Sequence, residues 1–272
     1  MEPVSDLVAC TYESLESFTK GFSPQNYIGD TQYGKLYRGQ IQKGLETLGV
    51  IVKIWGNEFT SFATTAEHQL SRWQNEIKLM TESDVRSHPN VAKLIGFCSE
   101  NGRLGVVYEL QPVDSLWSLI RKDDFKWIAW IKVALGFACL LEFLHDQGLW
   151  VHNISSAHLL VEQNFNPRLV DFCMIAGGVF GETHHDYEVG SAGHVDPRGY
   201  NGERKSVSLV DESLKSDPFF DAHDGVEITK LAMRCVDRRP EQRPTMKEVV
   251  CCLRKLKVVN SIGDVIGREE HP

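Results

Sequence analysis

The feature that most constrains the fold of this chain is a change of texture near residue 115. From Tyr27 to about Val113, short β-branched runs are separated by glycine-containing turns. Only residues 67–81 interrupt them, with apolar residues at the helical spacings of three and four. Beyond Ser115 the apolar residues follow helical periodicity. A sheet-forming region followed by a helical region predicts an α+β fold with two lobes.

Helical and strand periodicity also places individual elements. The helix over 67–81 is expected to pack through Leu70, Trp73, Ile77 and Met80. Two short strands are expected on either side of residues 164–167. Further helices are predicted within 1–25, over 127–145 where the residues are apolar nearly all round, and within 227–256 where Arg239–Pro240 separates two of them.

Composition and charge exclude several classes of protein. The 272 residues include 42% hydrophobic residues, enough for one large domain or two lobes. A net charge of -8 argues against nucleic-acid binding. Six basic residues are expected on solvated faces, namely Arg38, Lys43, Lys247, Arg254, Lys255 and Lys257. Seven cysteines without CxxC spacing favour neither a disulfide framework nor a zinc site, which predicts a reducing, cytoplasmic compartment. No apolar run approaches the ~18 residues of a membrane span, so direct membrane insertion is not expected.

A glycine-rich turn lies between two of the strand-like runs. Gly29 and Gly34 flank it, and such a turn lets backbone N–H groups approach a phosphate closely. Thr31 stands where a G-x-G-x-x-G pattern has its middle glycine. Taken alone, the pattern is explained equally well by an ordinary β-turn.

Lys53 and Glu76 form the second candidate motif. Lys53 ends the run Val50-Ile51-Val52, and Glu76 follows on the amphipathic helix. A buried lysine needs an anionic partner, so we interpret the two residues as an ion pair that could also contact phosphates. On their own they could be an exposed lysine and an exposed glutamate, and it is the motifs further along the chain that favour the pair.

The remaining motifs form an ordered series. They are residues 88–91 (HPNV), 94–98 (LIGFC), 104–110 (LGVVYEL), 143–145 (FLH), 164–172 (NFNPRLVDF), 234–237 (RCVD) and 241–246 (EQRPTM). Over roughly residues 20–257, the chain resembles plant receptor-like kinases and receptor-like cytoplasmic kinases, which are related to the Pelle and IRAK kinases. The resemblance implies a bilobal protein-kinase fold, with an antiparallel sheet and one helix in the N-lobe and a mainly helical C-lobe.

The resemblance also implies roles for single residues. Tyr108 matches the gatekeeper before the hinge, and Asp171 matches the D-F-G aspartate, a weak candidate for holding a metal ion. Met80, Leu94, His152 and Phe172 would form a stacked apolar column. The implied, vestigial nucleotide-binding residues are Gly29, Gly34, Leu36, Ile51, Lys53, Glu76, Tyr108, Glu109, Gln111, Leu160 and Asp171.

The chain departs from the family where the chemistry is done. Asn153 takes the place of the catalytic base, Ser155 that of a lysine and His158 that of a metal-binding asparagine. No Asp or Glu occurs between Trp150 and Val161, so no shift of the alignment restores the base. Asparagine cannot accept a proton at neutral pH, and imidazole is a poor ligand for magnesium. No catalytic residue is therefore expected to be intact.

Two further departures concern the nucleotide and the C-lobe. Ile51 replaces a small residue that packs on adenine, and overpacking of this kind costs about 1–3 kcal/mol. We therefore expect ATP with magnesium to bind weakly or not at all. After residues 190–197 the chain runs directly into 208–211, so the C-lobe is expected to lack its central helix and the one after it. Either another element fills the core or the product is marginally stable.

The sequence thus predicts a lead-in segment (1–25), an N-lobe (26–114), a shortened C-lobe (115–258) and a tail (259–272). The predicted function is that of a pseudokinase, an inactive adaptor, scaffold or decoy in plant receptor-kinase or immune signalling. The alternative is a serine/threonine kinase with weak or atypical phosphotransfer. Expected partners are active receptor-like kinases or immune receptors, which could recruit this cytoplasmic protein to the inner face of the plasma membrane. Residues 177–199 are expected to form the variable part of the interface.

Overall fold

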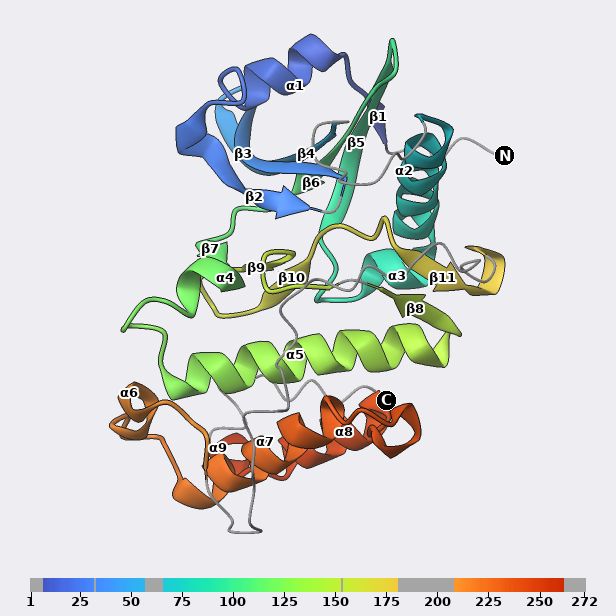
Figure 1. Ribbon diagram of the computed structural model, residues 1–272. Coiled ribbons are helices and arrows are strands. Elements are labelled where there is room, and N and C mark those ends of the chain that lie inside the picture. The colour runs from blue at the N-terminus through green and yellow to red at the C-terminus, as the bar shows by residue number, and fades with distance from the viewer. Residues whose placement is uncertain (1–6, 32, 57–65, 153, 181–207, 262–272) are drawn as a thin grey trace. The chain divides into compact units, whose positions relative to one another are not determined.

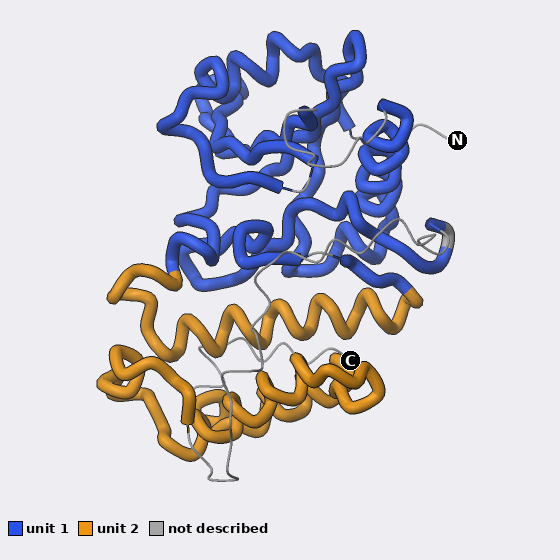
Figure 2. The backbone as a smooth tube through the Cα atoms, in the orientation of Figure 1, with its two compact units in different colours: residues 1–119, 149–183 blue, residues 120–148, 184–272 orange. Residues whose placement is uncertain are grey.

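Figure 1 shows the computed structural model of the protein, which describes residues 7–31, 33–56, 66–152, 154–180 and 208–261. The chain forms two compact units (Figure 2). Unit 1 comprises residues 1–119 and 149–183, and unit 2 comprises residues 120–148 and 184–272. This grouping is not the same as the predicted lobes, whose boundaries at 26–114 and 115–258 stay a prediction.

Unit 1 is built on a six-stranded sheet with the strand order β1-β5-β6-β4-β3-β2. All its neighbouring strands are antiparallel except the short β1, which pairs with β5 in parallel. The strands are β1 (Val8–Ala9), β2 (Tyr27–Thr31), β3 (Gly34–Lys43), β4 (Glu46–Trp55), β5 (Lys93–Glu100) and β6 (Arg103–Glu109). The predicted antiparallel N-terminal sheet is confirmed.

The two faces of this sheet carry different helices. Helix α1 (Tyr12–Phe18) is capped at its N-terminus by Thr11, whose side chain accepts a hydrogen bond from the Ser14 backbone N–H. Its Leu15 is fully buried in a cluster with Val50, Val52, Cys98 and Val107. Lys53 lies between Val52 and Ile54 and points to the opposite face, because successive side chains of a strand alternate. That opposite face is covered by helix α2 (Ala66–Thr81).

The buried face of α2 differs from the prediction. Leu70 was expected to pack inward but is 38% exposed, whereas Gln69, Trp73 and Glu76 are buried. The indole N–H of Trp73 donates to the Gly105 carbonyl of β6 at 3.0 Å. Residues three apart share a helix face, so this contact turns Glu76 toward the sheet. The electrostatic stabilisation from pairing the buried Lys53 with Glu76 outweighs the hydrophobic stabilisation from burying Leu70.

The rest of unit 1 consists of short elements. A three-stranded sheet has the order β10-β9-β7, and a two-stranded sheet joins β11 to β8. The strands are β7 (Asp114–Ser115), β8 (Leu149–Val151), β9 (Leu159–Val161), β10 (Pro167–Leu169) and β11 (Ile175–Gly177), and the helical segments are η1 (Pro24–Asn26), α3 (Ser83–Ser87), α4 (Leu116–Leu119) and η3 (Gly178–Phe180). The two strands predicted around residues 164–167 are confirmed as β9 and β10.

Unit 2 is helical in the part that the structure describes, as predicted. Its elements are α5 (Trp127–Asp146), α6 (Glu212–Lys215), α7 (Ala222–Cys235), η5 (Pro240–Gln242), α8 (Met246–Arg254) and α9 (Lys257–Ser261). Residues of α5, α7, α8 and α9 share one apolar core. Two buried aspartates accept hydrogen bonds from the first residues of helices. Asp217 accepts the Trp127 N–H at the start of α5, and Asp224 accepts the N–H groups of Lys257 and Val258 at the start of α9.

Helix α5 is long and apolar enough to cross a membrane by length and composition, with a mean hydropathy of 1.8. Lys132 and Glu142 interrupt its apolar run. Seven of its side chains are buried, and Trp127, Ile131 and Ala138 belong to the core shared with α8. This packing is that of a core helix.

Candidate functional site

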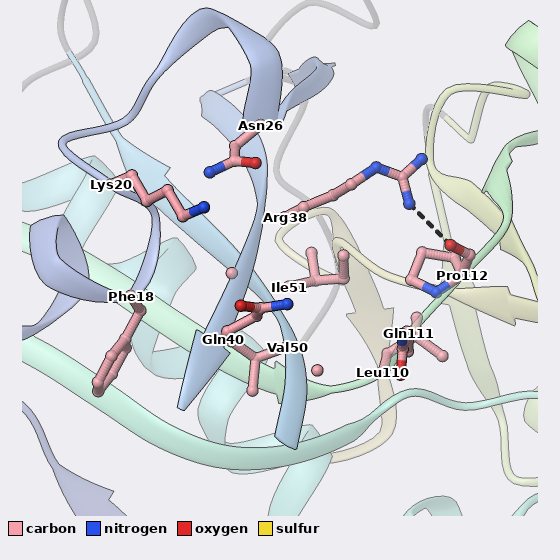
Figure 3. Close-up of a pocket in the computed structure, with 12 residues that line it drawn as sticks. Phe18, Lys20, Asn26, Arg38, Gln40, Val50, Ile51, Leu110, Gln111 and Pro112 are labelled. Carbon is pink, nitrogen blue, oxygen red and sulfur yellow. Dashed lines mark hydrogen bonds between the residues drawn. The ribbon is translucent and has the colours of Figure 1, made fainter. Parts of the chain in front are cut away.

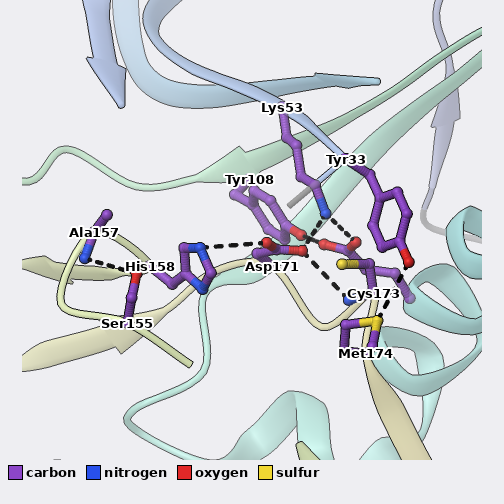
Figure 4. Close-up of polar contacts among 10 residues, drawn as sticks. Tyr33, Lys53, Tyr108, Ser155, Ala157, His158, Asp171, Cys173 and Met174 are labelled. Carbon is purple, nitrogen blue, oxygen red and sulfur yellow. Dashed lines mark hydrogen bonds and ion pairs between the residues drawn. The ribbon is translucent and has the colours of Figure 1, made fainter. Parts of the chain in front are cut away.

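The candidate site begins with a buried lysine on β4. Strand register places Lys53 opposite Leu36 on β3 and opposite Val106 on β6, so its side chain starts from the middle of the sheet. The Lys53 Nζ lies 2.5 Å from the Glu76 Oε2 of α2 and 2.5 Å from the Asp171 Oδ1 (Figure 4). The predicted pair of Lys53 and Glu76 is present, and Asp171 shares the same ammonium group.

The charges of these three groups are strongly coupled. Burial alone would lower the pKa of Lys53, but the carboxylates of Asp171 and Glu76 raise it above its ordinary value. Burial raises the pKa of Glu76 despite the nearby ammonium. For Asp171, burial is outweighed by Lys53 and then His158, which hold its pKa below the ordinary value. The cluster therefore favours the charged forms of Lys53 and Asp171, whereas burial disfavours the charged form of Glu76.

Tyr108 adds a fourth buried group to the cluster. It is fully buried, and its hydroxyl donates to the Glu76 Oε1. Burial and then the Glu76 carboxylate raise the pKa of Tyr108 well above its ordinary value, which keeps the phenol neutral. Tyr108 also pairs with Ile51 across β6 and β4. Tyr108, the predicted gatekeeper on β6, thus links the sheet to α2 through its hydrogen bond to Glu76.

The hairpin of β9 and β10 brings His158 to Asp171. The Val170 N–H donates to the His158 carbonyl at 3.1 Å. This bond continues the pairing of β9 with β10 by one residue pair, and the next residue along the chain is Asp171. The His158 Nε2 lies 3.7 Å from the Asp171 Oδ2. Burial lowers the pKa of His158 in spite of the nearby Asp171 carboxylate. At neutral pH a neutral imidazole therefore faces the second oxygen of Asp171.

Ser155 has a local structural role. Its hydroxyl accepts the Ala157 N–H at 3.3 Å and its carbonyl accepts the His158 N–H at 3.0 Å (Figure 4). Such a turn sets the direction from which His158 enters the site. Asn153, the residue at the position of the base, lies outside the described residues.

Several of the predicted nucleotide-binding residues are closed to solvent, whereas Glu109 is half-buried and Gln111 is exposed. Leu36, Ile51 and Leu160 each have 0% exposed surface. Lys53 is likewise 0% exposed and Asp171 is 5% exposed. Ile51 fills its place on β4 between Arg38 of β3 and Tyr108 of β6. Leu36, Ile51, Lys53 and Leu160 therefore expose no surface in this structure.

A small cavity of about 220 Å³ lies next to this region, between the end of α1, the β3–β4 ribbon and residues 110–112 (Figure 3). Of the predicted nucleotide-binding residues, only Ile51 and Gln111 line it. A second cavity of about 500 Å³ touches only Glu109 and Gln111 of that set. Neither cavity reaches Lys53 or Asp171, so neither has the lining expected of a nucleotide site.

Arg38 corrects a prediction at this edge of the sheet. It was expected on a solvated face, but its guanidinium donates to the carbonyls of Pro112 at 2.7 Å and Val113 at 3.0 Å. It also lies 3.4 Å from the Asp114 carboxylate. These contacts join β3 to the segment after Gln111. A five-donor planar group suits several carbonyls at once, which explains the arginine here.

The predicted apolar column is incomplete. Met80, Leu94 and Phe172 are buried, but His152 is exposed. The His152 backbone N–H donates to the Met174 carbonyl at 2.9 Å, next to the pairing of β8 with β11. The alternation of this strand directs the His152 side chain away from the core. Only three of the four predicted members are therefore buried.

Comparison with known proteins identifies the family. The family model described as protein tyrosine and serine/threonine kinase matches residues 22–198. The chain is 25% identical to the probable serine/threonine-protein kinase CST of Arabidopsis thaliana, over 94% of this chain and 73% of that protein. It is 30% identical to the probable kinase PBL3, over 71% and 46%, and 24% identical to the kinase BIK1, over 91% and 75%, both from the same plant. The chain belongs to the protein kinase family.

Active members of this family bind ATP with magnesium. The residues of this chain do not fit that ligand. Magnesium prefers oxygen ligands in an octahedral arrangement, whereas the two oxygens of Asp171 face the Lys53 ammonium and the His158 imidazole. The fully buried Leu36, Ile51 and Leu160 leave no surface for adenine.

Proposed function

We propose that this protein is a pseudokinase, a member of the kinase family that acts by binding protein partners and not by transferring phosphate. The observation that supports it best is the closure of the nucleotide site, where Leu36, Ile51 and Leu160 have no exposed surface. A kinase that cannot hold ATP keeps a shape that other kinases and receptors can recognise. Its role would be that of an adaptor, scaffold or decoy.

The chemistry of the sequence supports the same proposal. General-base assistance requires a side chain that can accept the proton of the substrate hydroxyl. The segment between Trp150 and Val161 contains no carboxylate, and Asn153 stands at the base position. His158 adds a second difference, because it places an imidazole against the carboxylate that would hold a metal ion.

One observation favours the alternative, a serine/threonine kinase with weak or atypical phosphotransfer. The ion pairs of Lys53 with Glu76 and with Asp171 have the short distances of an assembled kinase site. Positioning and electrostatic stabilisation supply most of the catalysis in phosphoryl transfer. A rearranged site could therefore transfer phosphate slowly without the base.

The proposed partners are active receptor-like kinases or immune receptors of a plant. We base this on the resemblance to kinases of Arabidopsis thaliana. The proposed location is the cytoplasm, with recruitment to the inner face of the plasma membrane through partners. We also propose that the C-lobe is shortened after residue 199, a segment that lies within 181–207, outside the described residues.

Phosphate transfer tests the proposal. The purified protein should transfer no phosphate to itself or to a generic substrate when incubated with radiolabelled ATP and either magnesium or manganese. The control variants are Lys53→Met and Asp171→Asn, since each removes one arm of the ion-pair cluster. A reproducible signal that either variant abolishes would establish the alternative.

The interface is tested by exchange of a segment. Residues 183–188 carry the most varied polar residues of the proposed interface segment 177–199, and from residue 181 onward that segment lies outside the described residues. Replacing 183–188 by a Gly/Ser linker should abolish binding to a defined receptor-like kinase while the melting temperature stays unchanged. Binding that survives the exchange but is lost on substituting the exposed Leu70 of α2 would move the interface to that helix.

A further inference from the structure

Two cysteines of unit 1 stand opposite one another on neighbouring strands. Strand β1 pairs with β5 in parallel, with Ala9 opposite Phe97 (Figure 1). The Cys10 N–H donates to the Phe97 carbonyl at 2.8 Å, which continues this register by one residue and sets Cys10 opposite Cys98. The sequence gives no sign of this pair, because only the sheet brings the two positions together.

The two side chains lie on the same face of the sheet. Opposed residues of neighbouring strands point to one side, and Cys98 shares its side of β5 with Gly96 because side chains alternate along a strand. A Cβ atom added at Gly96 would lie 3.1 Å from the Cys10 Sγ, so the Cys10 thiol is over this side. Cys98 is fully buried in the apolar cluster around Leu15, and the half-buried Cys10 packs against that cluster.

The spacing of the pair suits a disulfide. Neighbouring strands lie about 4.7–4.9 Å apart, which sets the expected separation of the two Cα atoms. Disulfides join residues whose Cα atoms are about 4.4–6.8 Å apart. Both cysteines are free thiols in this structure. The Cys10 Sγ donates only a weak hydrogen bond, to the Val8 carbonyl at 3.6 Å, so little is lost when rotation about the Cα–Cβ bond turns it toward Cys98.

A bond at Cys10 would act on the edge of the sheet. Strand β1 has only two residues, and without it β5 would be an edge strand with unpaired backbone groups. On the other side of Cys10 the chain is held in place. The Tyr12 N–H donates to the Glu100 Oε2 at 2.8 Å, and the Arg103 guanidinium lies 4.3 Å from the centre of the Tyr12 ring. The weakly held segment is therefore the one before Cys10.

We propose that Cys10 and Cys98 form an oxidation-sensitive pair, which hydrogen peroxide converts to a disulfide that fastens β1 to β5. The Cys10 sulfur, the more accessible of the two, attacks one oxygen of the peroxide. The O–O bond breaks, and the thiol proton leaves with the departing hydroxide, so that a sulfenic acid and water result. The Cys98 sulfur then attacks the Cys10 sulfur. The S–S bond forms, the S–O bond breaks, and a second water carries away the Cys98 proton. Two electrons pass from the two thiols to the peroxide.

The surroundings of the pair set when it reacts. Burial raises the pKa of both thiols, so each is almost entirely protonated at neutral pH. Low concentrations of peroxide therefore leave the pair reduced, and a thiol reductant restores it after oxidation. This inference concerns the edge of the sheet and goes beyond the proposed function, since it holds whether or not the protein transfers phosphate.

A peroxide titration followed by peptide mass spectrometry tests the inference. The native protein, Cys10→Ser and Cys98→Ala are treated with rising concentrations of hydrogen peroxide at neutral pH. The remaining thiols are then alkylated in denaturant, and the state of every cysteine is assigned. Cys235 and Cys251 are exposed, so they serve as internal controls for oxidation that does not depend on pairing.

In the native protein, a peptide that joins Cys10 to Cys98 should appear before any disulfide of Cys235 or Cys251 and should disappear with dithiothreitol. The same treatment should raise the melting temperature by several degrees, because a cross-link restricts the unfolded chain. In Cys10→Ser, Cys98 should remain a thiol and the melting temperature should not rise. In Cys98→Ala, oxidation of Cys10 should stop at the sulfenic acid, which dimedone traps.

Two results would overturn the inference. One is a native protein in which Cys98 stays a thiol at peroxide concentrations that oxidise Cys10. The other is pairing of Cys10 with Cys235 or Cys251 as often as with Cys98. If Cys98→Ala does not fold, the comparison of the native protein with Cys10→Ser still decides the question, because Cys10 is only half-buried.

Discussion

Replacing Lys53 by methionine should strongly destabilise unit 1 although the side-chain volume hardly changes. The Lys53 ammonium lies 2.5 Å from both Glu76 and Asp171, and all three side chains are 0–2% exposed. Removing one partner of a buried ion pair costs about 3–5 kcal/mol, because the remaining charge is left unpaired in the interior. Here two carboxylates share the ammonium, so we expect the upper half of that range.

The matched control is the same substitution at an exposed pair. Lys93 lies 2.7 Å from Glu109, with side chains 52% and 35% exposed. Exposed pairs contribute about 0–1 kcal/mol, so Lys93→Met should be nearly neutral. In thermal melts followed by circular dichroism, Lys53→Met should lower the melting temperature by roughly 8–20 °C, at about 2–4 °C per kcal/mol.

The pH dependence of the loss provides an internal check. Without the ammonium, burial raises the pKa of both carboxylates, so as pH falls they take up protons in Lys53→Met before they do in the native protein. The difference in stability from the native protein should therefore shrink toward acid pH. A loss below about 1 kcal/mol at pH 7, equal to that of Lys93→Met, would refute the reasoning that burial makes this pair important.

Three further predictions concern other parts of the chain. Leu15→Ala should lower the free energy of unfolding by about 2–5 kcal/mol in urea titrations, since Leu15 is fully buried beneath the sheet; a loss under 1 kcal/mol would show that α1 is not part of the core. Because the pKa of His158 is lowered by burial, only the unfolded state takes up its proton as pH falls below about 6.5, so stability falls there. His158→Asn should show a shallower fall than the native protein, and equal slopes would contradict the assigned burial. Asp224→Asn should cost about 1–3 kcal/mol and speed amide exchange at residues 257–258, because an amide cannot accept both N–H groups as the carboxylate does; unchanged exchange there would argue against that role.

Most elements could be predicted because their signals are local. The antiparallel strands show β-branched runs between turns, and α5 shows a long apolar segment, so periodicity alone locates them. Lys53 and Glu76 could also be paired in advance, but only with the help of the later motifs, because on their own the two residues could equally have been exposed. The boundaries of α7 were less well predicted: it begins at Ala222, where Asp221 caps it, before the expected apolar pattern.

The parts that could not be predicted depend on contacts between distant residues. The buried Tyr33 donates a hydrogen bond to Met174, 141 positions away, and nothing in the local pattern of the glycine-rich turn indicates that its tyrosine turns inward. The exposure of Leu70 depends on how Glu76 reaches Lys53, and periodicity does not encode a charge demand of this kind. The exposure of His152 follows from the pairing of β8 with β11, which sets the direction of its side chain.

The stability of the protein with ATP and magnesium tests the central claim most directly. A ligand at a hundredfold excess over its dissociation constant stabilises the folded state by about 2.7 kcal/mol, which in a chain of this size raises the melting temperature by several degrees. With Ile51 fully buried and Asp171 already paired, we expect almost no shift, and no difference when magnesium is replaced by EDTA. A shift of several degrees that requires magnesium, and that Ile51→Ala does not enlarge, would show that the site is open to nucleotide and that the account is wrong.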